Sequence, residues 1–178
     1  YYLQQALQKT PDDARLHNDL GQVFIQLGAA EEALPHLLKA RRLDSDNVVI
    51  AYNLGLTYQE LKQWGLARTA FETALQLDSQ YLKARFSLAQ LDYQQGDVVA
   101  AESELVTILG RDPDYLKALE LLASIRISQK RNADAIDLLE KVLAMEPQNF
   151  QVRKKLADLV LKVKESQNVP WAITFTGN

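Results

Sequence analysis

The sequence predicts an all-α protein, an α-solenoid of stacked helix–turn–helix repeats, and three observations lead to this prediction. A leucine followed by a small residue recurs every 34 residues, at Leu20-Gly21, Leu54-Gly55, Leu88-Ala89, Leu122-Ala123 and Leu156-Ala157. Between these pairs, apolar residues recur at helical spacing in two segments of about 12–14 residues. The repeat boundaries carry proline or serine, at Pro11, Ser45, Ser79, Pro113 and Pro147. Such a fixed period is typical of repeat architectures.

The first helix of each repeat is expected to contain the small residue. Glycine inside a helix costs about 1 kcal/mol relative to alanine, so Gly21 and Gly55 suggest that another helix crosses close by. The second helix has its own small residue twelve positions later, at Ala33, Ala67, Ala101 and Ala135. A large apolar residue follows after four more positions, at Leu37, Phe71, Leu105 and Leu139. We expect the small residues of the two helices to mark their crossing point.

The turn between the two helices carries a glycine in two of the four full repeats. Gly28 and Gly96 stand where a helix commonly ends in a left-handed residue. Lys62 and Lys130 hold the same position in the other two repeats. The sequence therefore predicts a different turn chemistry in those two repeats.

The starts of the first helices carry predicted N-caps. Asp13, Asn47 and Asn149 follow the repeat boundary, and their side chains can accept hydrogen bonds from the first free N–H groups of a helix. Tyr81 and Tyr115 hold this position in the other repeats and predict weaker caps.

The period divides the whole chain. We expect the second helix of a partial preceding repeat at 1–13, full repeats at 14–47, 48–81, 82–115 and 116–149, a capping helix or first helix of a fifth repeat at 150–164, and an extended apolar tail at 165–178.

Composition excludes several classes of function. The 178 residues carry a formal net charge of −3, which gives no electrostatic reason to expect nucleic-acid binding. No apolar run reaches the roughly 18 residues of a membrane-spanning helix, so no membrane insertion is expected. Cysteine is absent, which removes disulfides and cysteine nucleophiles. The sequence starts at Tyr1 rather than methionine, so a fragment or processed chain is an open possibility; a cytoplasmic location is favoured, although an upstream signal would be invisible.

Catalytic and metal sites are not expected either. His17 and His36 fall in different predicted helices with no third ligand at helical spacing. Paired acidic residues lie at turns and helix starts, where the helix dipole favours them. We therefore expect no catalytic residue, no metal and no cofactor, and we expect both histidines in packing or surface positions.

The pattern resembles the tetratricopeptide repeat (TPR) family, whose repeat is 34 residues long and folds as helix–turn–helix. The resemblance covers about residues 1–164. The aromatic residue of the family's first helix is present as Phe24 and Tyr58, whereas Asp92 and Arg126 replace it later. The resemblance implies a right-handed superhelix whose first helices line a concave face, and it implies a binding surface for a peptide or partner helix.

Binding residues are expected on the first helices, at positions that packing does not use. The expected peptide- or partner-binding residues are Asn18, Gln22, Tyr52, Asn53, Leu56, Lys83, Phe86, Gln90, Tyr93, Lys117 and Glu120. The amides among them can hydrogen-bond a peptide backbone, and the aromatic residues are typical interface anchors. The alternative is that the aromatic rings pack between adjacent helices and the amides are only solvated.

One TPR subclass holds the C-terminal carboxylate of heat-shock chaperones with lysines and asparagines on three successive first helices. Asn53 and Lys83 match that set, but Asn18, Gln22 and Ser87 do not. The sequence therefore disfavours a carboxylate clamp.

The end of the sequence departs from the repeat. Pro170 bars helix continuation, and Trp171, Ile173 and Phe175 alternate with polar or small residues as in an extended segment. We expect this tail to dock, either on the last helices of its own chain or on the concave face of a second copy.

The sequence thus predicts a non-enzymatic protein–protein interaction scaffold or adaptor. Two alternatives stay open. The chain is a docking module of a larger enzyme or assembly protein, or it is a scaffold that associates with itself through its tail.

Overall fold

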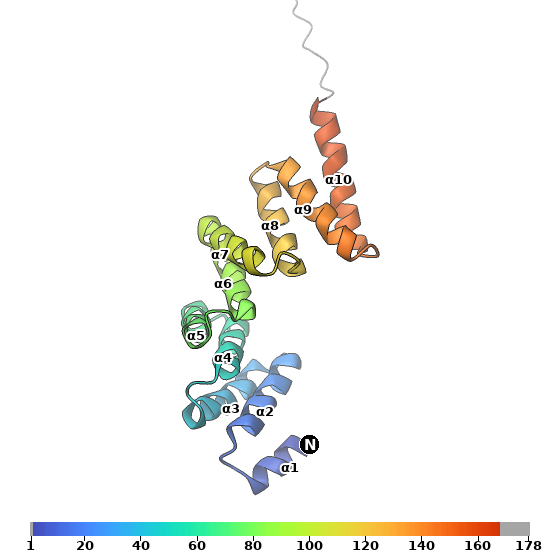
Figure 1. Ribbon diagram of the computed structural model, residues 1–178. Coiled ribbons are helices and arrows are strands. Elements are labelled where there is room, and N and C mark those ends of the chain that lie inside the picture. The colour runs from blue at the N-terminus through green and yellow to red at the C-terminus, as the bar shows by residue number, and fades with distance from the viewer. Residues whose placement is uncertain (1, 168–178) are drawn as a thin grey trace, which may run out of the picture. The chain divides into compact units, whose positions relative to one another are not determined.

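The computed structural model describes residues 2–167 and shows only helices in them (Figure 1), which confirms the all-α class. The ten helices are α1 (Tyr2–Lys9), α2 (Ala14–Gln26), α3 (Ala30–Leu43), α4 (Val48–Glu60), α5 (Trp64–Leu77), α6 (Leu82–Gln94), α7 (Val98–Arg111), α8 (Leu116–Ser128), α9 (Asn132–Met145) and α10 (Phe150–Gln167). The expected docking of the tail falls on residues 168–178, outside the described residues.

The chain forms two compact units, and α7 contributes residues to both. Unit 1 extends to Glu104, and unit 2 starts at Leu105. In unit 1, α2 packs on α3 and α4 packs on α5, while contacts of α3 with α4 and of α5 with α6 join successive helix pairs. In unit 2, α9 packs between α8 and α10. The main contacts therefore join helices that are close neighbours along the chain.

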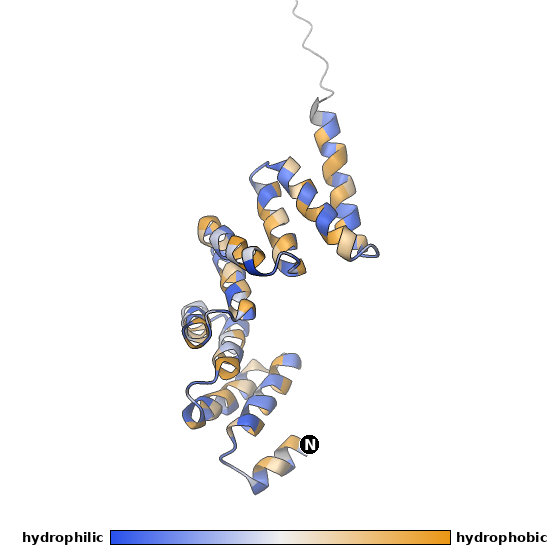
Figure 2. Cartoon of the chain, viewed as in Figure 1, coloured by the Kyte–Doolittle hydropathy of each residue, from blue (hydrophilic) through white to orange (hydrophobic). Residues whose placement is uncertain are grey.

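The core of each unit lies where these helices meet. Hydrophobic and hydrophilic residues both occur along the helices (Figure 2), and the buried ones come from first and second helices alike. Leu37 and Phe71 are completely buried in unit 1, and so is Leu139 in unit 2. Tyr58 packs against two clusters of buried residues in unit 1, so one continuous apolar region runs through successive helix pairs.

The small residue of the first helix makes room for the large residue of the second. A Cβ atom added to Gly21 would lie 2.5 Å from Cγ of Leu37, and one added to Gly55 would overlap the ring of Phe71. The crossing point thus pairs a small residue with a large one sixteen positions later. The small residues of the second helices, Ala33 and Ala67, are also completely buried.

All four turns within the full repeats use a left-handed residue. Gly28 has a φ of 71° and Gly96 a φ of 86°, as predicted. Lys62 and Lys130 have φ values of 57° and 61°, so the prediction of a different turn chemistry there is wrong. The turn between the two helices of a repeat requires a left-handed residue, so Lys62 and Lys130 adopt that conformation despite the steric cost of their Cβ atoms.

The predicted N-caps form. The side chain of Asp13 accepts hydrogen bonds from the backbone N–H groups of Arg15 and Leu16, and Asn47 caps α4 in the same way. The side chain of Asn149 accepts a hydrogen bond from Val152 N at 3.1 Å. The side chains of Tyr81 and Tyr115 make no capping hydrogen bond, in line with the weaker caps predicted for those helices.

Polar residues at the family's aromatic position are paired across helices. Asp92 in α6 is only 3% exposed, and its carboxylate forms an ion pair with the guanidinium of Arg68 in α5. Arg126 in α8 lies 3.9 Å (Nε to Oδ2) from Asp134 in α9. At the position that Phe24 and Tyr58 hold in the first two repeats, these ion pairs join neighbouring helices instead of an aromatic ring.

The last helix is longer than expected. The sequence predicts its end near residue 164, whereas α10 continues to Gln167. Glu165, Ser166 and Gln167 carry no helix breaker, and Pro170 disfavours helical geometry only at the residue before it.

Candidate functional site

Two of the expected binding amides are hydrogen-bonded to each other. Asn53 in α4 donates from Nδ2 to Oδ1 of Asn18 in α2 over 2.9 Å. Asn53 is 4% exposed, whereas Asn18 is half-buried. This hydrogen bond joins two first helices and uses the side-chain oxygen of Asn18, not its NH₂ group.

The expected aromatic anchors in unit 1 lie mostly in packing contacts. The Tyr52 ring centroid lies 5.9 Å from that of Phe71 and 5.4 Å from that of Tyr81. Burial, together with the neighbouring Tyr52, raises the pKa of Tyr81. Phe86 is only 8% exposed. This arrangement is the one described by the alternative interpretation, in which aromatic rings pack between helices.

The remaining expected residues of unit 1 reach the surface. Gln22 in α2 and Lys83 in α6 are exposed. Leu56, Gln90 and Tyr93 are half-buried, so each combines a fixed position with an accessible side. Asn18 and Tyr52 are half-buried as well, so seven of the nine expected residues of unit 1 keep exposed surface.

Unit 2 contains a groove of about 610 Å³ between α8, α9 and α10. Its floor is apolar and consists of Ile127, Leu139, Val152 and Leu159. Its rim is polar and consists of Glu120, Gln151, Lys154, Lys155, Asp158 and Lys162. The combination of a small apolar floor with convergent polar groups is typical of a ligand-binding surface.

Of the two residues expected to bind in unit 2, the structure places one at this groove. Glu120 lines it, and its Oε1 accepts a hydrogen bond from Nδ2 of Asn149 at 3.5 Å. Lys117 is exposed on the same helix but does not line the groove. Lys155 lines the opposite wall and donates from Nζ to Oγ of Ser124 at 3.0 Å.

The groove residues of α10 were missed by the sequence analysis. Their spacing, at residues 151, 154, 155, 158 and 162, is the i, i+3, i+4, i+7, i+11 pattern of one helix face. That pattern contains three lysines and a single acid, which reads as an ordinary solvated face. Only the contact with α8 turns it into the wall of a groove.

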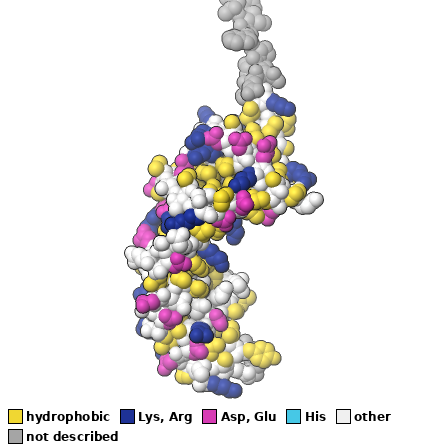
Figure 3. All heavy atoms as spheres, viewed as in Figure 1, with side chains coloured by type: hydrophobic (Ala, Val, Ile, Leu, Met, Phe, Trp, Pro, Cys, Tyr) yellow, Lys and Arg dark blue, Asp and Glu magenta, His cyan; other side chains and the backbone are white. Residues whose placement is uncertain are grey.

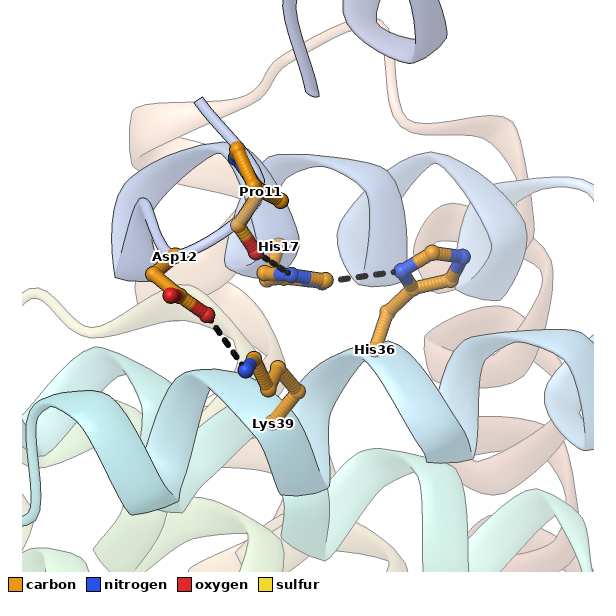
Figure 4. Close-up of polar contacts among 5 residues, drawn as sticks. All are labelled: Pro11, Asp12, His17, His36 and Lys39. Atoms are coloured by element: carbon orange, nitrogen blue, oxygen red, sulfur yellow. Dashed lines mark hydrogen bonds and ion pairs between the residues drawn. The ribbon is translucent and has the colours of Figure 1, made fainter. Parts of the chain in front are cut away.

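The two histidines lie next to each other, which the sequence did not indicate (Figure 4). The distance between Nδ1 of His17 and Nδ1 of His36 is 3.0 Å, and Nε2 of His17 lies 3.0 Å from the carbonyl oxygen of Pro11. Because a carbonyl oxygen only accepts, Nε2–H of His17 donates to it, which leaves Nδ1 of His17 to accept a hydrogen bond from Nδ1–H of His36. Phe24 stacks on His36 with ring centroids 5.8 Å apart.

The two histidines occupy packing positions, as expected. The rings bond directly to each other, and Lys39 and Asp12 form an ion pair beside them (Figure 4). Within residues 2–167, no group of three or more histidine or acidic residues is arranged to hold a metal ion. No helix in that range is both long and apolar enough to cross a membrane.

Three protein-family models of tetratricopeptide repeats together match most of the chain. Residues 58–125 and 116–149 match families described as tetratricopeptide repeat, and residues 21–62 match one described as TPR repeat. These ranges overlap end to end, so the repeat signal is continuous from residue 21 to residue 149.

Two curated proteins align with about half of the chain. Protein O-mannosyl-transferase F38B6.6 of Caenorhabditis elegans is 28% identical over 88 residues, which are 49% of this chain and 13% of that protein. Protein O-mannosyl-transferase TMTC3 of Homo sapiens is 30% identical over 95 residues, which are 53% of this chain and 10% of that protein. The aligned part is therefore about a tenth of the length of these relatives.

Solved structures share the fold over most of the chain. MamA from Desulfovibrio magneticus RS-1 has a TM-score of 0.74 at 19% identity and covers 86% of this chain and 87% of its own. PilF of Pseudomonas aeruginosa has a TM-score of 0.78 at 24% identity, with coverage of 85% and 69%. The structure of the APC/C hetero-tetramer Cut9-Hcn1 has a TM-score of 0.78 at 18% identity, with coverage of 88% and 32%.

Proposed function

Because this chain belongs to the tetratricopeptide repeat family, we propose that it is a non-enzymatic scaffold whose first helices bind a segment of a partner protein. TPR helices form a repeated framework that presents side chains without catalytic groups. The proposal concerns two surfaces, one on unit 1 and one on unit 2, and each is considered separately.

The groove of unit 2 is the observation that carries the proposal. An apolar side chain of a partner fits the floor at Ile127 and Leu159, while Lys155 and Lys162 on the rim can donate hydrogen bonds to carbonyl or carboxylate oxygens. The rim carries three lysines and two acids, so it favours a segment with one apolar anchor and a neighbouring acidic residue. Lys117 in α8 adds an exposed positive charge outside the groove.

In unit 1, we propose a second contact area made of the expected residues that remain accessible. Gln22, Gln90 and Asn18 supply amides for a peptide backbone, and Tyr93 and Lys83 supply an aromatic edge and a charge. Leu56 adds a half-buried apolar side chain to this area. Tyr52, Asn53 and Phe86 contribute by holding together the helices that present the other side chains.

A second candidate function is that of a TPR segment within a larger protein. The observation that favours it is the match to O-mannosyl-transferases, in which the aligned region makes up about a tenth of each protein. In that case the chain would position a partner or substrate protein for an activity located elsewhere. The binding surfaces proposed above would be the same.

The experiment compares two lysine variants of the full chain. Lys162→Glu reverses a charge at the rim of the groove, whereas Lys164→Glu makes the same change two residues later, outside the groove. Proteins captured by the immobilised wild-type chain are identified by mass spectrometry and then titrated as purified proteins against both variants. We expect Lys162→Glu to weaken binding several-fold and Lys164→Glu to leave it unchanged.

The proposal fails if both variants bind every captured protein as tightly as the wild type does. Thermal melting of each variant shows whether a loss of binding arises from unfolding. Lys83→Glu, tested in the same way, addresses the surface of unit 1.

A further inference from the structure

The first helix of the fifth repeat lacks the cover that the other first helices have. Gly21 lies against Leu37 and Gly55 against Phe71, and the corresponding Ala89 and Ala123 are completely buried. The next residue in the 34-residue register is Ala157 in α10, and it is exposed. Within the described residues, no second helix follows α10.

Two large apolar residues accompany Ala157 on the same side of α10. Phe150 is 67% exposed and Leu161 is 58% exposed. At about 100° per residue, Phe150, Ala157 and Leu161 share one face, opposite to Val152 and Leu159, which pack in the core shared with α9. Hydrophobic side chains also reach the surface beside charged ones in this part of the molecule (Figure 3).

The residues that follow α10 carry the large residue that this register requires. Ile173 stands sixteen positions after Ala157, as Leu37 does after Gly21 and Phe71 after Gly55. Pro170 prevents this segment from simply continuing α10. In an extended chain, alternate side chains point the same way, so Trp171, Ile173 and Phe175 form one apolar edge.

The reach and the spacing of this segment match the exposed face. Residues 168–178 extend over about 36 Å at about 3.3 Å per residue, whereas α10 measures about 26 Å from Gln167 back to Phe150. Two residues of extended chain advance about 6.6 Å, and the four residues from Leu161 back to Ala157 span about 6 Å. Trp171 can therefore lie over Leu161 while Ile173 lies over Ala157.

We propose that residues 168–178 run back along α10 and cover the face formed by Phe150, Ala157 and Leu161. The segment takes the place of the missing second helix and closes the end of the repeat array, where an exposed apolar face would otherwise promote association. Ile173 fills the position over Ala157, and Phe175 extends the cover towards Phe150.

The test uses the fluorescence of Trp171 in the full chain. The sequence contains two tryptophans, so Trp64→Phe leaves Trp171 as the single reporter. We expect blue-shifted emission and weak quenching by acrylamide, both independent of protein concentration. Leu161→Ser should shift the emission to the red and raise the quenching constant several-fold. Val99→Ser, at a residue that is 80% exposed in α7, is the matched control and should change neither.

Ile173→Ser provides a second variant that lies outside the described helices and should also release Trp171. Circular dichroism confirms that each variant keeps its helices. Solvent-exposed emission in the parent, or equal quenching in the Leu161→Ser and Val99→Ser variants, would overturn the proposal. Shielding that disappears on dilution would also overturn it, because it would assign the cover to a second copy of the chain.

Discussion

Gly55 is the residue at which a single added carbon has the largest expected effect. A Cβ at this position would overlap the ring of Phe71, which is completely buried and cannot move away. Overpacking of this kind costs about 1–3 kcal/mol, so we expect Gly55→Ala to lower the free energy of unfolding by that amount. Denaturant titration measures it. Gly65→Ala is the control, because nothing lies within 4 Å of its added Cβ and helix propensity should make it neutral or stabilising.

Replacing Lys62 by glycine should make the protein more stable. Its φ of 57° is in the left-handed region, which costs a residue with a side chain roughly 1–2 kcal/mol, part of which the greater freedom of unfolded glycine cancels. We expect Lys62→Gly to raise the melting temperature. The reciprocal change, Gly96→Lys, should lower it. A higher melting temperature for both variants would contradict this account of the turns.

His36 should make stability depend on pH. Burial, and to a lesser extent His17, lowers the pKa of His36 below its ordinary value of 6.5. The unfolded chain then takes up this proton at a higher pH than the folded chain, so the free energy of unfolding falls as the pH drops below 6.5. Beside the two rings, Lys39 of α3 forms an ion pair with Asp12 of the turn before α2 (Figure 4).

His36→Gln tests this dependence, because it removes the titrating group. Between about pH 7.5 and about pH 5.5, the variant should lose less stability than the wild type in parallel denaturant titrations. Each protein is compared with itself at the two pH values, so any constant effect of the substitution cancels. Equal losses in the two proteins would show that His36 contributes nothing to the pH dependence.

At the scale of helices, the pairing of Arg68 with Asp92 holds α5 against α6. Asp92 is almost fully buried, so Arg68→Met would leave its carboxylate without a partner, which should cost about 1–3 kcal/mol. The double variant Arg68→Met with Asp92→Tyr restores the aromatic residue that Tyr58 provides in the preceding repeat. We expect its melting temperature to exceed that of the single variant. Equal melting temperatures would mean that the buried carboxylate is not the cause of the loss.

The helices could be predicted well from the sequence because their signals are local. Periodic apolar residues, caps such as Asn47 and the glycine at Gly28 act within a few positions of one helix. The contact between His17 and His36 could not be predicted, because it depends on the rotation of two helices about their axes. The same holds for the groove of unit 2, where Lys155 looks like any solvated lysine until α8 is placed beside it. Phe86 is the reverse case, since an aromatic residue expected to bind is only 8% exposed.

At the scale of the molecule, the ends of the repeat array should open before its middle. Helix α4 packs against α2, α3 and α5, whereas α1 has its main contact with α2 alone. In a repeat protein, stability is roughly a sum over neighbouring contacts, so fewer neighbours mean easier local opening. We expect hydrogen exchange measured by mass spectrometry to be much faster in α1 than in α4. Equal protection of the two helices would indicate a single cooperative transition.

The hydrogen bond between Asn18 and Asn53 spans only 35 residues, and the main helix contacts are just as local. This locality has a consequence for synthesis on the ribosome. At about 5–20 residues per second, a 34-residue repeat emerges in roughly 2–7 seconds, whereas a helix forms within about a microsecond. Each pair of helices can thus close on the pair made just before it while the rest of the chain is still being translated. Over the described helices, an array that grows in this way keeps little unpaired apolar surface exposed at any moment during translation.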